Sequence, residues 1–263
     1  MPEYLGQHFL KNQAAIAKIV TALDLREGDT VIEIGPGRGA LTAELLKKPI
    51  KLIGIEKDSV LVDRLRREFQ ISNFKFQIVE GDILKVLPKI KIRNLKFKIV
   101  GNIPYYLTGF LFRIISELEN KPSLIVFTIQ KEVAERIIAQ PPKMNLLAAS
   151  VQIWAEPEIL MILPPEDFDP PPKIDSAIIR LRIGNKELGI RELGNYYKLI
   201  KIIFKQPRKT ILNNLSVSNT HSSKGEVKQK LQNIDLTGEE RGQDLSIEKL
   251  IELSIVFPII PNS

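Results

Sequence analysis

A glycine-rich turn and two acidic residues mark three points of the sequence where an apolar stretch ends. The stretch from Thr30 to Ile34 runs into Gly35-Pro36-Gly37-Arg38-Gly39, Glu56 ends a second stretch, and Asp82 follows a third. Glycines in such a turn let a ligand approach the backbone closely. A carboxylate at the end of a strand can accept hydrogen bonds from both hydroxyls of a ribose, and another can accept from the exocyclic amine of an adenine. The spacing G-x-G-x-G differs from the G-x-G-x-x-G of dinucleotide folds, and with the two acids it indicates a site for S-adenosylmethionine. We expect the Arg38 side chain to point to solvent.

The tetrapeptide Asn102-Ile103-Pro104-Tyr105 follows a fourth apolar stretch and has the groups needed to act on a base. The amino nitrogen of adenine is a weak nucleophile because its lone pair is delocalised into the ring. Hydrogen bonds from its two N–H groups to Asn102 Oδ1 and to the Ile103 carbonyl would draw that nitrogen toward tetrahedral geometry. Pro104 has no competing N–H and stiffens the turn, and Tyr105 can stack on the base. The tetrapeptide resembles the (D/N/S)-(P/I/L)-P-(Y/F) signature of methyltransferases that act on exocyclic amines of bases.

The elements that must position these residues alternate between strand-like and helix-like stretches. The expected strands are residues 30–34, 51–55, 75–79, 97–100, 123–129, 151–155 (with a buried Trp154) and 176–183. The expected helices are residues 13–23 with Asn12 as cap, 58–69 with Asp58 as cap, 111–118 and 131–139. This alternation predicts a parallel, doubly wound sheet with helices on both faces. Such sheets bind ligands at the carboxyl ends of their strands, which is where the candidate residues fall.

A change of composition after Ile183 predicts a second domain. Residues 184–189 resemble a linker, and residues 216–223 a polar loop. Helical periodicity covers residues 191–204, 207–215, 224–233 and 246–256. We therefore expect an α/β domain over residues 1–184 and a small all-α domain over residues 185–263.

Composition narrows the class of protein. The sequence has no cysteine and only two histidines, which excludes a disulfide scaffold, a zinc–cysteine site and a cysteine nucleophile, and disfavours a multi-histidine metal site. Its 38 basic and 31 acidic residues give a net charge of +7, which suits a polyanionic partner. Charged residues are all basic in the stretches 85–98 and 193–224, and we expect residues 85–98 and 198–209 to hold phosphates.

The beginning of the chain and its apolar runs bear on location. The first ten residues carry an acid and lack the cationic start and the apolar core of a signal peptide. No apolar run approaches the ~18 residues of a membrane span. We expect a cytoplasmic protein that does not contact a membrane.

Four further motifs extend the pattern over nearly the whole chain. These are Gly6-Gln7-His8-Phe9-Leu10, the heptapeptide Q-K-E-V-A-E-R from Gln130, the nonapeptide F-D-P-P-P-K-I-D-S from Phe168, and Arg208-Lys209-Thr210 with Asn213-Asn214-Leu215. Together with the glycine turn and N-I-P-Y, they resemble the ribosomal RNA adenine N6,N6-dimethyltransferase family. Within that family, the chain is most similar to the small-subunit (16S) type.

The resemblance implies a fold and a set of site residues. It implies a Rossmann-like class I methyltransferase sheet over residues 1–184, which binds S-adenosylmethionine, and a helical RNA-binding domain over residues 185–263. It assigns cofactor contacts to His8, Leu10, Gly35, Glu56, Asp82 and Asn102, and contacts with the target base to Asn102, Pro104, Tyr105 and Phe168. No metal is implied. Pro207 replaces an arginine of the family's usual R-R-K-T, which removes one phosphate contact and is expected to start a helix.

The implied activity is S-adenosylmethionine-dependent dimethylation of N6 on two adjacent adenines near the 3′ end of small-subunit ribosomal RNA. The implied partner is that RNA within a pre-ribosomal 30S particle, bound by a monomer during ribosome biogenesis, with no role for DNA. Two alternatives stay open. One is a large-subunit ribosomal RNA methyltransferase of the macrolide-resistance type, and the other is a ribosome-assembly factor that works mainly by binding. A nucleotide-dependent oxidoreductase is disfavoured by the glycine spacing.

Overall fold

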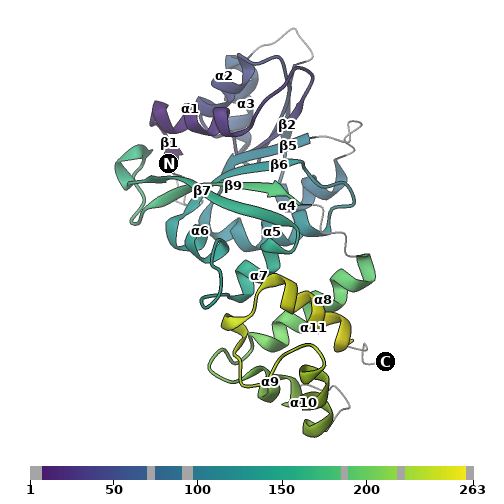
Figure 1. Ribbon diagram of the computed structural model, residues 1–263. Helices are drawn as coiled ribbons and strands as arrows, with labels where there is room; N and C mark the ends of the chain where they lie inside the picture. Colours follow the sequence, from purple (N-terminus) through teal and green to yellow (C-terminus); the bar gives the residue numbers. More distant parts are fainter. Residues whose placement is uncertain (1–7, 70–74, 91–96, 185–188, 218–222, 259–263) are drawn as a thin grey trace. The chain divides into compact units, whose positions relative to one another are not determined.

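The computed structural model describes residues 8–69, 75–90, 97–184, 189–217 and 223–258. Its contacts divide the chain into two compact units (Figure 1). Unit 1 comprises residues 1–135 and 155–183, and unit 2 comprises residues 136–154 and 184–263. The division after residue 183 falls beside the expected linker. Residues 136–154, which the sequence analysis assigned to the first domain, group with unit 2.

Unit 1 is built on a seven-stranded sheet with the strand order β4-β3-β2-β5-β6-β9-β7. The strands are β2 (Thr30–Ile34), β3 (Lys51–Glu56), β4 (Phe76–Glu80), β5 (Phe97–Asn102), β6 (Leu124–Gln130), β7 (Ala155–Leu163) and β9 (Ser176–Ile183). Every residue of β2 and nearly every residue of β5 is buried, as expected for central strands covered on both faces. The chain runs from β2 outward to β4 and then returns to β5, so the strand order reverses between β2 and β5.

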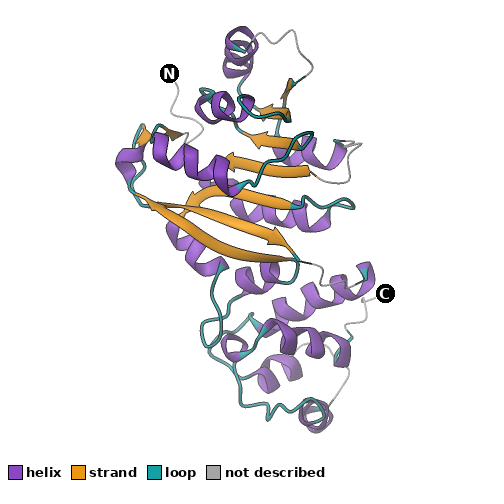
Figure 2. Ribbon diagram, turned by 45° about the horizontal axis from the view of Figure 1, so that its top comes forward, coloured by secondary structure: helices purple, strands orange, loops and turns teal. Residues whose placement is uncertain are grey.

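Helices lie on both faces of this sheet (Figures 1 and 2). They are α1 (Gln13–Ala22), α2 (Ala40–Leu46), α3 (Ser59–Glu68), α4 (Ile83–Val86), α5 (Thr108–Glu117) and α6 (Lys131–Ile137), and the division between the units falls within α6, after residue 135. The predicted caps of α1 and α3 are confirmed. Asn12 accepts a hydrogen bond from the Ala15 amide, and Asp58 accepts one from the Val60 amide.

Two predictions about the sheet are wrong. The sheet is mixed, because β9 runs antiparallel to both β6 and β7. Residues 164–175, which join β7 to β9, contain a 3-10 turn (Pro165–Asp167) and the short strand β8 (Phe168–Asp169) but no crossover helix, and the two strands form an antiparallel pair. The strand predicted over residues 151–155 does not exist, because α7 (Leu146–Gln152) occupies its first two residues, a turn the next two, and β7 begins only at Ala155. Asn145 caps α7 by accepting from the amides of Leu147 and Ala148, and periodicity alone does not distinguish a short buried helix from a buried strand. Trp154 is buried as expected, but it lies in the turn between them.

A second sheet joins two segments that are far apart in the sequence. Strand β1 (Phe9–Leu10) pairs antiparallel with β8 (Phe168–Asp169), so that Phe9 faces Asp169 and Leu10 faces Phe168. The side chains of Leu10 and Phe168 belong to the hydrophobic cluster around α1. The motif that contains Phe9 and Leu10 and the motif that begins at Phe168 are therefore paired with each other in the fold.

The regular elements of unit 2, within its described residues, are helices joined by turns and loops. Besides α7, unit 2 contains α8 (Ile190–Ile203), α9 (Ile211–Val217), α10 (Lys224–Gln232) and α11 (Ile247–Val256). The predicted helices are thus confirmed, with one correction at Pro207. Pro207 does not start α9 but lies in a turn before it, because Asn214 Nδ2 donates to the carbonyls of Ile203, Gln206 and Lys209 and holds that turn open.

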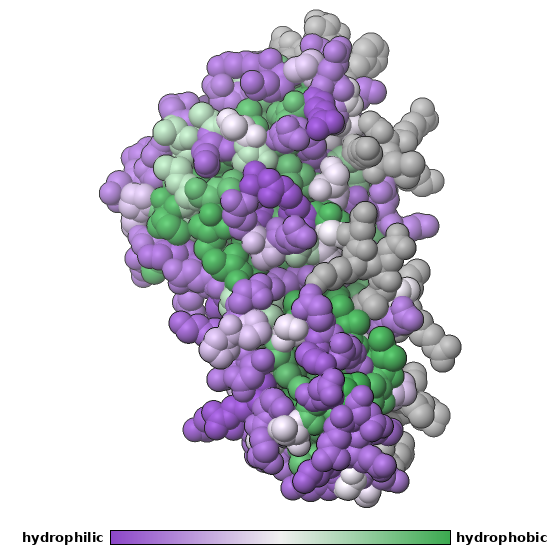
Figure 3. Space-filling view, in the orientation of Figure 1, coloured by the Kyte–Doolittle hydropathy of each residue, from purple (hydrophilic) through white to green (hydrophobic). Residues whose placement is uncertain are grey.

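Polar and charged residues cover most of the face seen in Figure 3. Within the described part of the chain, no helix combines the length and the apolar character needed to cross a membrane.

Candidate functional site

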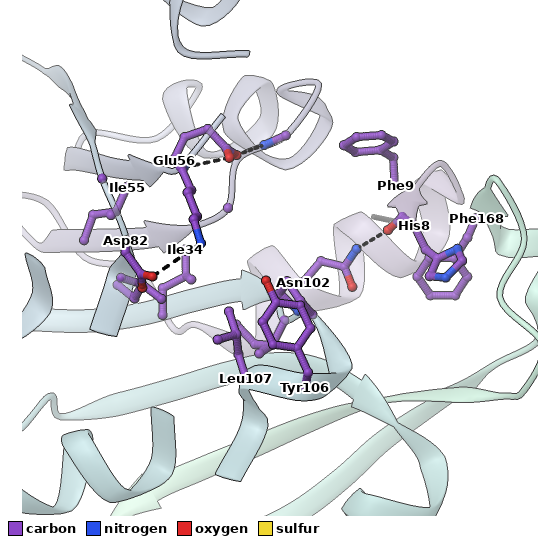
Figure 4. A pocket seen from close by; sticks show the side chains of 17 residues that line it. His8, Phe9, Ile34, Ile55, Glu56, Asp82, Asn102, Tyr106, Leu107 and Phe168 are labelled. Atoms are coloured by element: carbon purple, nitrogen blue, oxygen red, sulfur yellow. Dashed lines mark hydrogen bonds and ion pairs between the residues drawn. The ribbon is translucent and has the colours of Figure 1, made fainter. Parts of the chain in front are cut away.

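Four strand ends meet at one cavity of unit 1. It is lined by Gly35 after β2, Glu56 at the end of β3, Asp82 after β4 and Asn102 at the end of β5 (Figure 4). These residues lie at the edge of the sheet where the strand order reverses, which is where open α/β sheets bind ligands. His8 and Phe168 line the same cavity. Leu10 does not, and instead lines an adjoining cavity together with Gly35 and Asn102.

The glycine turn leaves room for a ligand at its first glycine. Gly35 has a φ of +62°, and no atom lies within 4 Å of the position that a Cβ would take. Gly37 has a φ of +59°, but a Cβ there would come within 2.8 Å of the Phe9 ring. The two glycines therefore serve different purposes. Gly35 leaves one side of the turn open to the cavity, whereas Gly37 accommodates an aromatic ring.

Glu56 connects the end of β3 to the glycine turn. The residue is only 4% exposed, and its carboxylate accepts hydrogen bonds from the amides of Gly37 at 3.1 Å, Lys57 at 2.8 Å and Asp58 at 3.0 Å. Three backbone donors hold the carboxylate in place, as a buried charge requires. A carboxylate has about four acceptor positions, so capacity remains for a ligand that enters the cavity.

Asp82 combines a structural contact with a position on the cavity wall. Its Oδ1 accepts from the Leu84 amide at 3.0 Å and caps α4, while its Oδ2 lies 3.5 Å from Lys57 Nζ. The cap fixes the orientation of the carboxylate. The side chain is 28% exposed, and its Oδ2, which is paired only loosely with Lys57, can also accept from a ligand.

Asn102 is held by the segment at the beginning of the described chain. Its Nδ2 donates to the backbone carbonyl of His8 at 2.5 Å (Figure 4). The amide nitrogen is thereby engaged, and the Oδ1 remains as the acceptor on a residue that lines the cavity. The next residue, Ile103, donates its own amide to the Thr128 carbonyl at 3.0 Å, which fixes the backbone of N-I-P-Y against β6.

The aromatic residues near Asn102 differ in accessibility. Phe168 is 1% exposed and lines the cavity from β8. The side chain of Tyr105 lies outside the described residues, although its backbone begins a short 3-10 turn over Tyr105–Leu107. Tyr106, which was not among the predicted site residues, is 56% exposed and lines the cavity. Its position directly after N-I-P-Y in the sequence could have indicated that Tyr106 lies near the site.

Two further residues near the site were not expected to act there. The guanidinium of Arg38 does not simply point to solvent, because it pairs with Asp169 at 2.5 Å and lies 4.5 Å from the centre of the Phe9 ring. Glu33 lines the adjoining cavity and accepts a hydrogen bond from the Thr42 hydroxyl at 2.8 Å. Burial raises the pKa of the Glu33 carboxyl to about 8. The sequence feature that could have indicated a buried carboxyl is an acid within the mostly apolar stretch T-V-I-E-I.

Lys98, the last member of the first basic stretch, is not available to a phosphate. It is 9% exposed and donates to Asp29 Oδ2 at 2.7 Å and to the Asp24 carbonyl. Burial raises the pKa of the Asp29 carboxyl, but the hydrogen bonds from Lys98 and from the Arg26 amide, together with the charges of Lys98 and Arg26, outweigh it, so that this pKa is lowered overall. Lys85 and Lys89 are exposed, and residues 91–96 lie outside the described residues. The expectation that Lys98 holds a phosphate is therefore wrong.

The second basic stretch lies on the surface of unit 2. Its exposed members are Lys198, Lys201, Lys205, Arg208 and Lys209. Lys198 and Lys201 are on α8, and the others lie in the turn that Asn214 holds through three carbonyls. Asn214 thus has a clear role, which is to shape the backbone that presents the basic residues.

Comparison with protein families gives one match over nearly the whole chain. The family described as "Ribosomal RNA adenine dimethylase" matches residues 3–254. The chain is 39% identical over 256 residues to the Ribosomal RNA small subunit methyltransferase A of Dehalococcoides mccartyi, covering 96% of this chain and 87% of that relative. It is 35% identical over 256 residues to the protein of the same name from Fusobacterium nucleatum, covering 96% of both.

Solved structures show the same similarity. A dimethyladenosine transferase from Plasmodium falciparum superposes with a TM-score of 0.81 at 25% identity, covering 94% of this chain and 96% of the other. A 23S rRNA methyltransferase superposes with a TM-score of 0.75 at 24% identity, covering 95% and 100%. The second similarity concerns the fold alone.

The buried Glu33 predicts a specific dependence of stability on pH. The pKa of Glu33 is about 8 in the folded protein against an ordinary value of 4.5, so the folded protein holds this proton more tightly than the unfolded chain does. The contribution of Glu33 to the free energy of unfolding is therefore fully present below about pH 4.5 and is lost as the pH rises toward 8. Glu33→Gln keeps the shape and never ionises. Its unfolding free energy should exceed that of the wild type by on the order of 3 kcal/mol at pH 7, measured by urea unfolding. The exposed Glu117→Gln serves as control, and parallel wild-type and Glu33→Gln profiles between pH 4.5 and 8 would contradict the prediction.

Proposed function

This chain belongs to the ribosomal RNA adenine dimethylase family, and from that premise we propose that it dimethylates N6 of two adjacent adenines near the 3′ end of small-subunit ribosomal RNA. The reaction depends on S-adenosylmethionine. The observation that carries the proposal is Asn102. Its amide nitrogen is engaged by the His8 carbonyl, and its oxygen is left for a donor on a cavity wall that it shares with Gly35, Glu56 and Asp82.

The residues of the cavity fit the cofactor. The open side of Gly35 can admit a ligand against the backbone, the Glu56 carboxylate can accept from ribose hydroxyls, and Asp82 Oδ2 can accept from an adenine amine. His8 and Leu10 complete the proposed set, His8 on the wall of this cavity and Leu10 on that of the adjoining one. When bound, S-adenosylmethionine supplies a methyl group made electrophilic by a positively charged sulfur.

The chain's part in the chemistry is to orient the target amine. We propose that Asn102 Oδ1 and the Ile103 carbonyl accept from the two N–H groups of adenine N6, which turns the nitrogen lone pair toward the methyl donor. These acceptors are held by the sheet, so they need little reorganisation during the reaction. Pro104 keeps a competing N–H away. The stacking of an unstacked base on Tyr105 and Phe168 stays a prediction, and Phe168, which is 1% exposed, would have to be uncovered for it. Positioning replaces a strong general base in this scheme.

The small subunit is proposed as the substrate because the relatives that share the name Ribosomal RNA small subunit methyltransferase A match this chain over nearly its full length. The likeness to a large-subunit enzyme extends to the fold only, so the macrolide-resistance type is not favoured. We further propose that the substrate is a pre-ribosomal 30S particle in the cytoplasm and that a monomer acts on it. Action by binding alone would leave the engaged Asn102 without a purpose.

Unit 2 is proposed to hold the RNA backbone. The exposed lysines and arginine of residues 198–209 offer positive charge that suits phosphates. Such contacts carry no sequence information, which would come from the adenine pocket in unit 1.

Replacing Glu56 tests the cofactor assignment. Glu56→Ala removes the acceptor for the two ribose hydroxyls, and charge-assisted hydrogen bonds contribute about 1.5–3 kcal/mol each, so the affinity for S-adenosylmethionine should fall at least about tenfold. Calorimetry measures this affinity, and Glu56→Gln should lie between alanine and wild type. Because Glu56 also accepts from three backbone amides, the melting temperature of each variant is recorded alongside. A folded alanine variant with native affinity would refute the assignment.

Replacing Asn102 tests the mechanism. Its proposed bond to N6 strengthens as the nitrogen becomes tetrahedral, so its loss should act on the rate more than on KM. Asn102→Ala should lower the single-turnover rate by about 10²–10³ under saturating S-adenosylmethionine and RNA. Asn102→Asp keeps an acceptor oxygen and should retain more activity than alanine. Dimethylation by the alanine variant at the native rate would rule out the mechanism.

Replacing three basic residues tests the RNA contact. Lys201, Lys205 and Lys209 changed together to glutamine should weaken RNA binding and make the plot of log affinity against log salt less steep, whatever the RNA sequence. The matched control changes Lys47, Lys48 and Lys51, which are exposed near the amino end of β3, opposite the site. Identical salt slopes for the two triple variants would show that residues 201–209 do not contact phosphates.

A further inference from the structure

Residues 8–12, which we name the strap, are bound along their length to the segment 167–170. Phe9 and Leu10 pair with β8, the Lys11 amide donates to the Asp167 carbonyl at 2.8 Å, and Asn12 Nδ2 donates to Asp167 Oδ1 at 2.7 Å. At the other end, His8 Nδ1 donates to the Pro170 carbonyl at 2.8 Å. His8 and Phe9 also line the cofactor cavity, so the strap forms part of its wall.

The glycine turn holds the strap from a second direction. Arg38 reaches from this turn to Asp169, with Nη1 and Oδ2 2.5 Å apart, and its guanidinium carbon lies 4.5 Å from the centre of the Phe9 ring. The same ring lies against Gly37, where a Cβ would come within 2.8 Å of it. Phe9 is thus in contact with the backbone of the turn and with Arg38. The ion pair links the turn to the segment that carries Phe168.

The strap in turn fixes the orientation of Asn102. Its His8 carbonyl accepts from Asn102 Nδ2. A carbonyl oxygen can only accept, so this bond distinguishes the nitrogen of the amide from its oxygen and selects one of its two flipped orientations. If the strap moved away, Asn102 would lose the contact that makes this selection.

We propose that Arg38 and Asp169 are positioning residues, which form an ionic latch that keeps the strap closed and, through the His8 carbonyl, keeps Asn102 Oδ1 directed at the target amine. The role given to Asn102 rests on the proposed function. The closing of the strap rests on the contacts alone. The latch has two consequences. It slows the departure of the cofactor, whose cavity the strap lines, and it raises the fraction of molecules in which Asn102 is correctly oriented.

The ion pair lies at the surface, so its strength depends on the salt concentration. The side chains of Arg38 and Asp169 are 45% and 54% exposed. An exposed pair with an added aromatic contact gives a modest effect that salt screens. Rising ionic strength should therefore speed the release of S-adenosylmethionine from the wild type, and less so from a protein without the pair.

Charge reversal tests the latch. The variants are Arg38→Asp, Asp169→Arg and the double variant that carries both. Three quantities are measured: the dissociation rate of S-adenosylmethionine without RNA, hydrogen exchange of the strap amides, and the single-turnover rate of methyl transfer to RNA with both substrates saturating. Each single variant should release the cofactor and exchange the strap amides about five- to tenfold faster, and transfer methyl groups about five- to tenfold more slowly with little change in KM. The double variant should recover at least half of each loss on a logarithmic scale, which a merely structural role would not produce.

The matched control is Arg64→Asp, which breaks an exposed ion pair with Glu68 on α3 whose side chains are 48% and 46% exposed. It should leave all three quantities unchanged. Native cofactor release and strap exchange in the single variants would overturn the latch, and failure of the double variant to improve on them would overturn the ion pair as its basis. Faster release with an unchanged single-turnover rate would overturn the positioning of Asn102. If the wild type fails to methylate adenine in RNA, the proposed function fails, while release and exchange still decide the latch.

Discussion

The close approach of β2 and β5 at their carboxyl ends is the constraint on which the rest of unit 1 depends. Ile34 and Gly101 are paired in register, and a Cβ on Gly101 would lie 2.6 Å from the Ile34 carbonyl oxygen. Only a residue without a side chain fits there. The pairing brings Gly35, which follows β2, and Asn102, which ends β5, to the wall of one cavity at the point where the strand order reverses. The wall for a cofactor and the acceptor for a base thus come from one backbone contact.

Each polar group of the site makes hydrogen bonds within the protein and keeps at least one acceptor position for a ligand. Glu56 is held by three backbone amides, Asp82 by the amino end of α4, and Asn102 by the His8 carbonyl. These bonds fix the orientation of each group before any ligand arrives. A group that is already oriented and desolvated in this way stabilises a ligand or a transition state with little reorganisation. The positions of these groups are therefore set by the protein itself.

The two units solve different physical problems. Unit 1 must hold a few acceptors within hydrogen-bonding distance of small chemical groups, and it does so at the ends of buried strands. Unit 2 must offer positive charge to a polyanion, for which exposure matters more than exact position. Its basic residues stand on α8 and on a turn held by the nearly buried Asn214. A basic residue serves the second purpose only where it is exposed. Lys98 lies in a basic stretch of the sequence, but in unit 1 it is paired with Asp29 and is not exposed to a polyanion.

Features that depend on local patterns could be predicted from the sequence alone. Apolar runs located β2 to β6 and β9, cap residues located the starts of α1 and α3, and the strand-end position of Gly35, Glu56, Asp82 and Asn102 was enough to expect them together, because parallel strands end at one edge of a sheet. The failures share another cause. The helix over residues 146–152, the antiparallel β9 and the β1–β8 pair depend on which distant segment each stretch meets, and short apolar runs carry no such information. Three contacts became known only from the folded chain: Arg38 reaches Asp169, Leu10 lines the adjoining cavity, and His8 orients Asn102 through its backbone carbonyl. A backbone carbonyl is the same in every residue, so its partner becomes known only when the chain has folded around it.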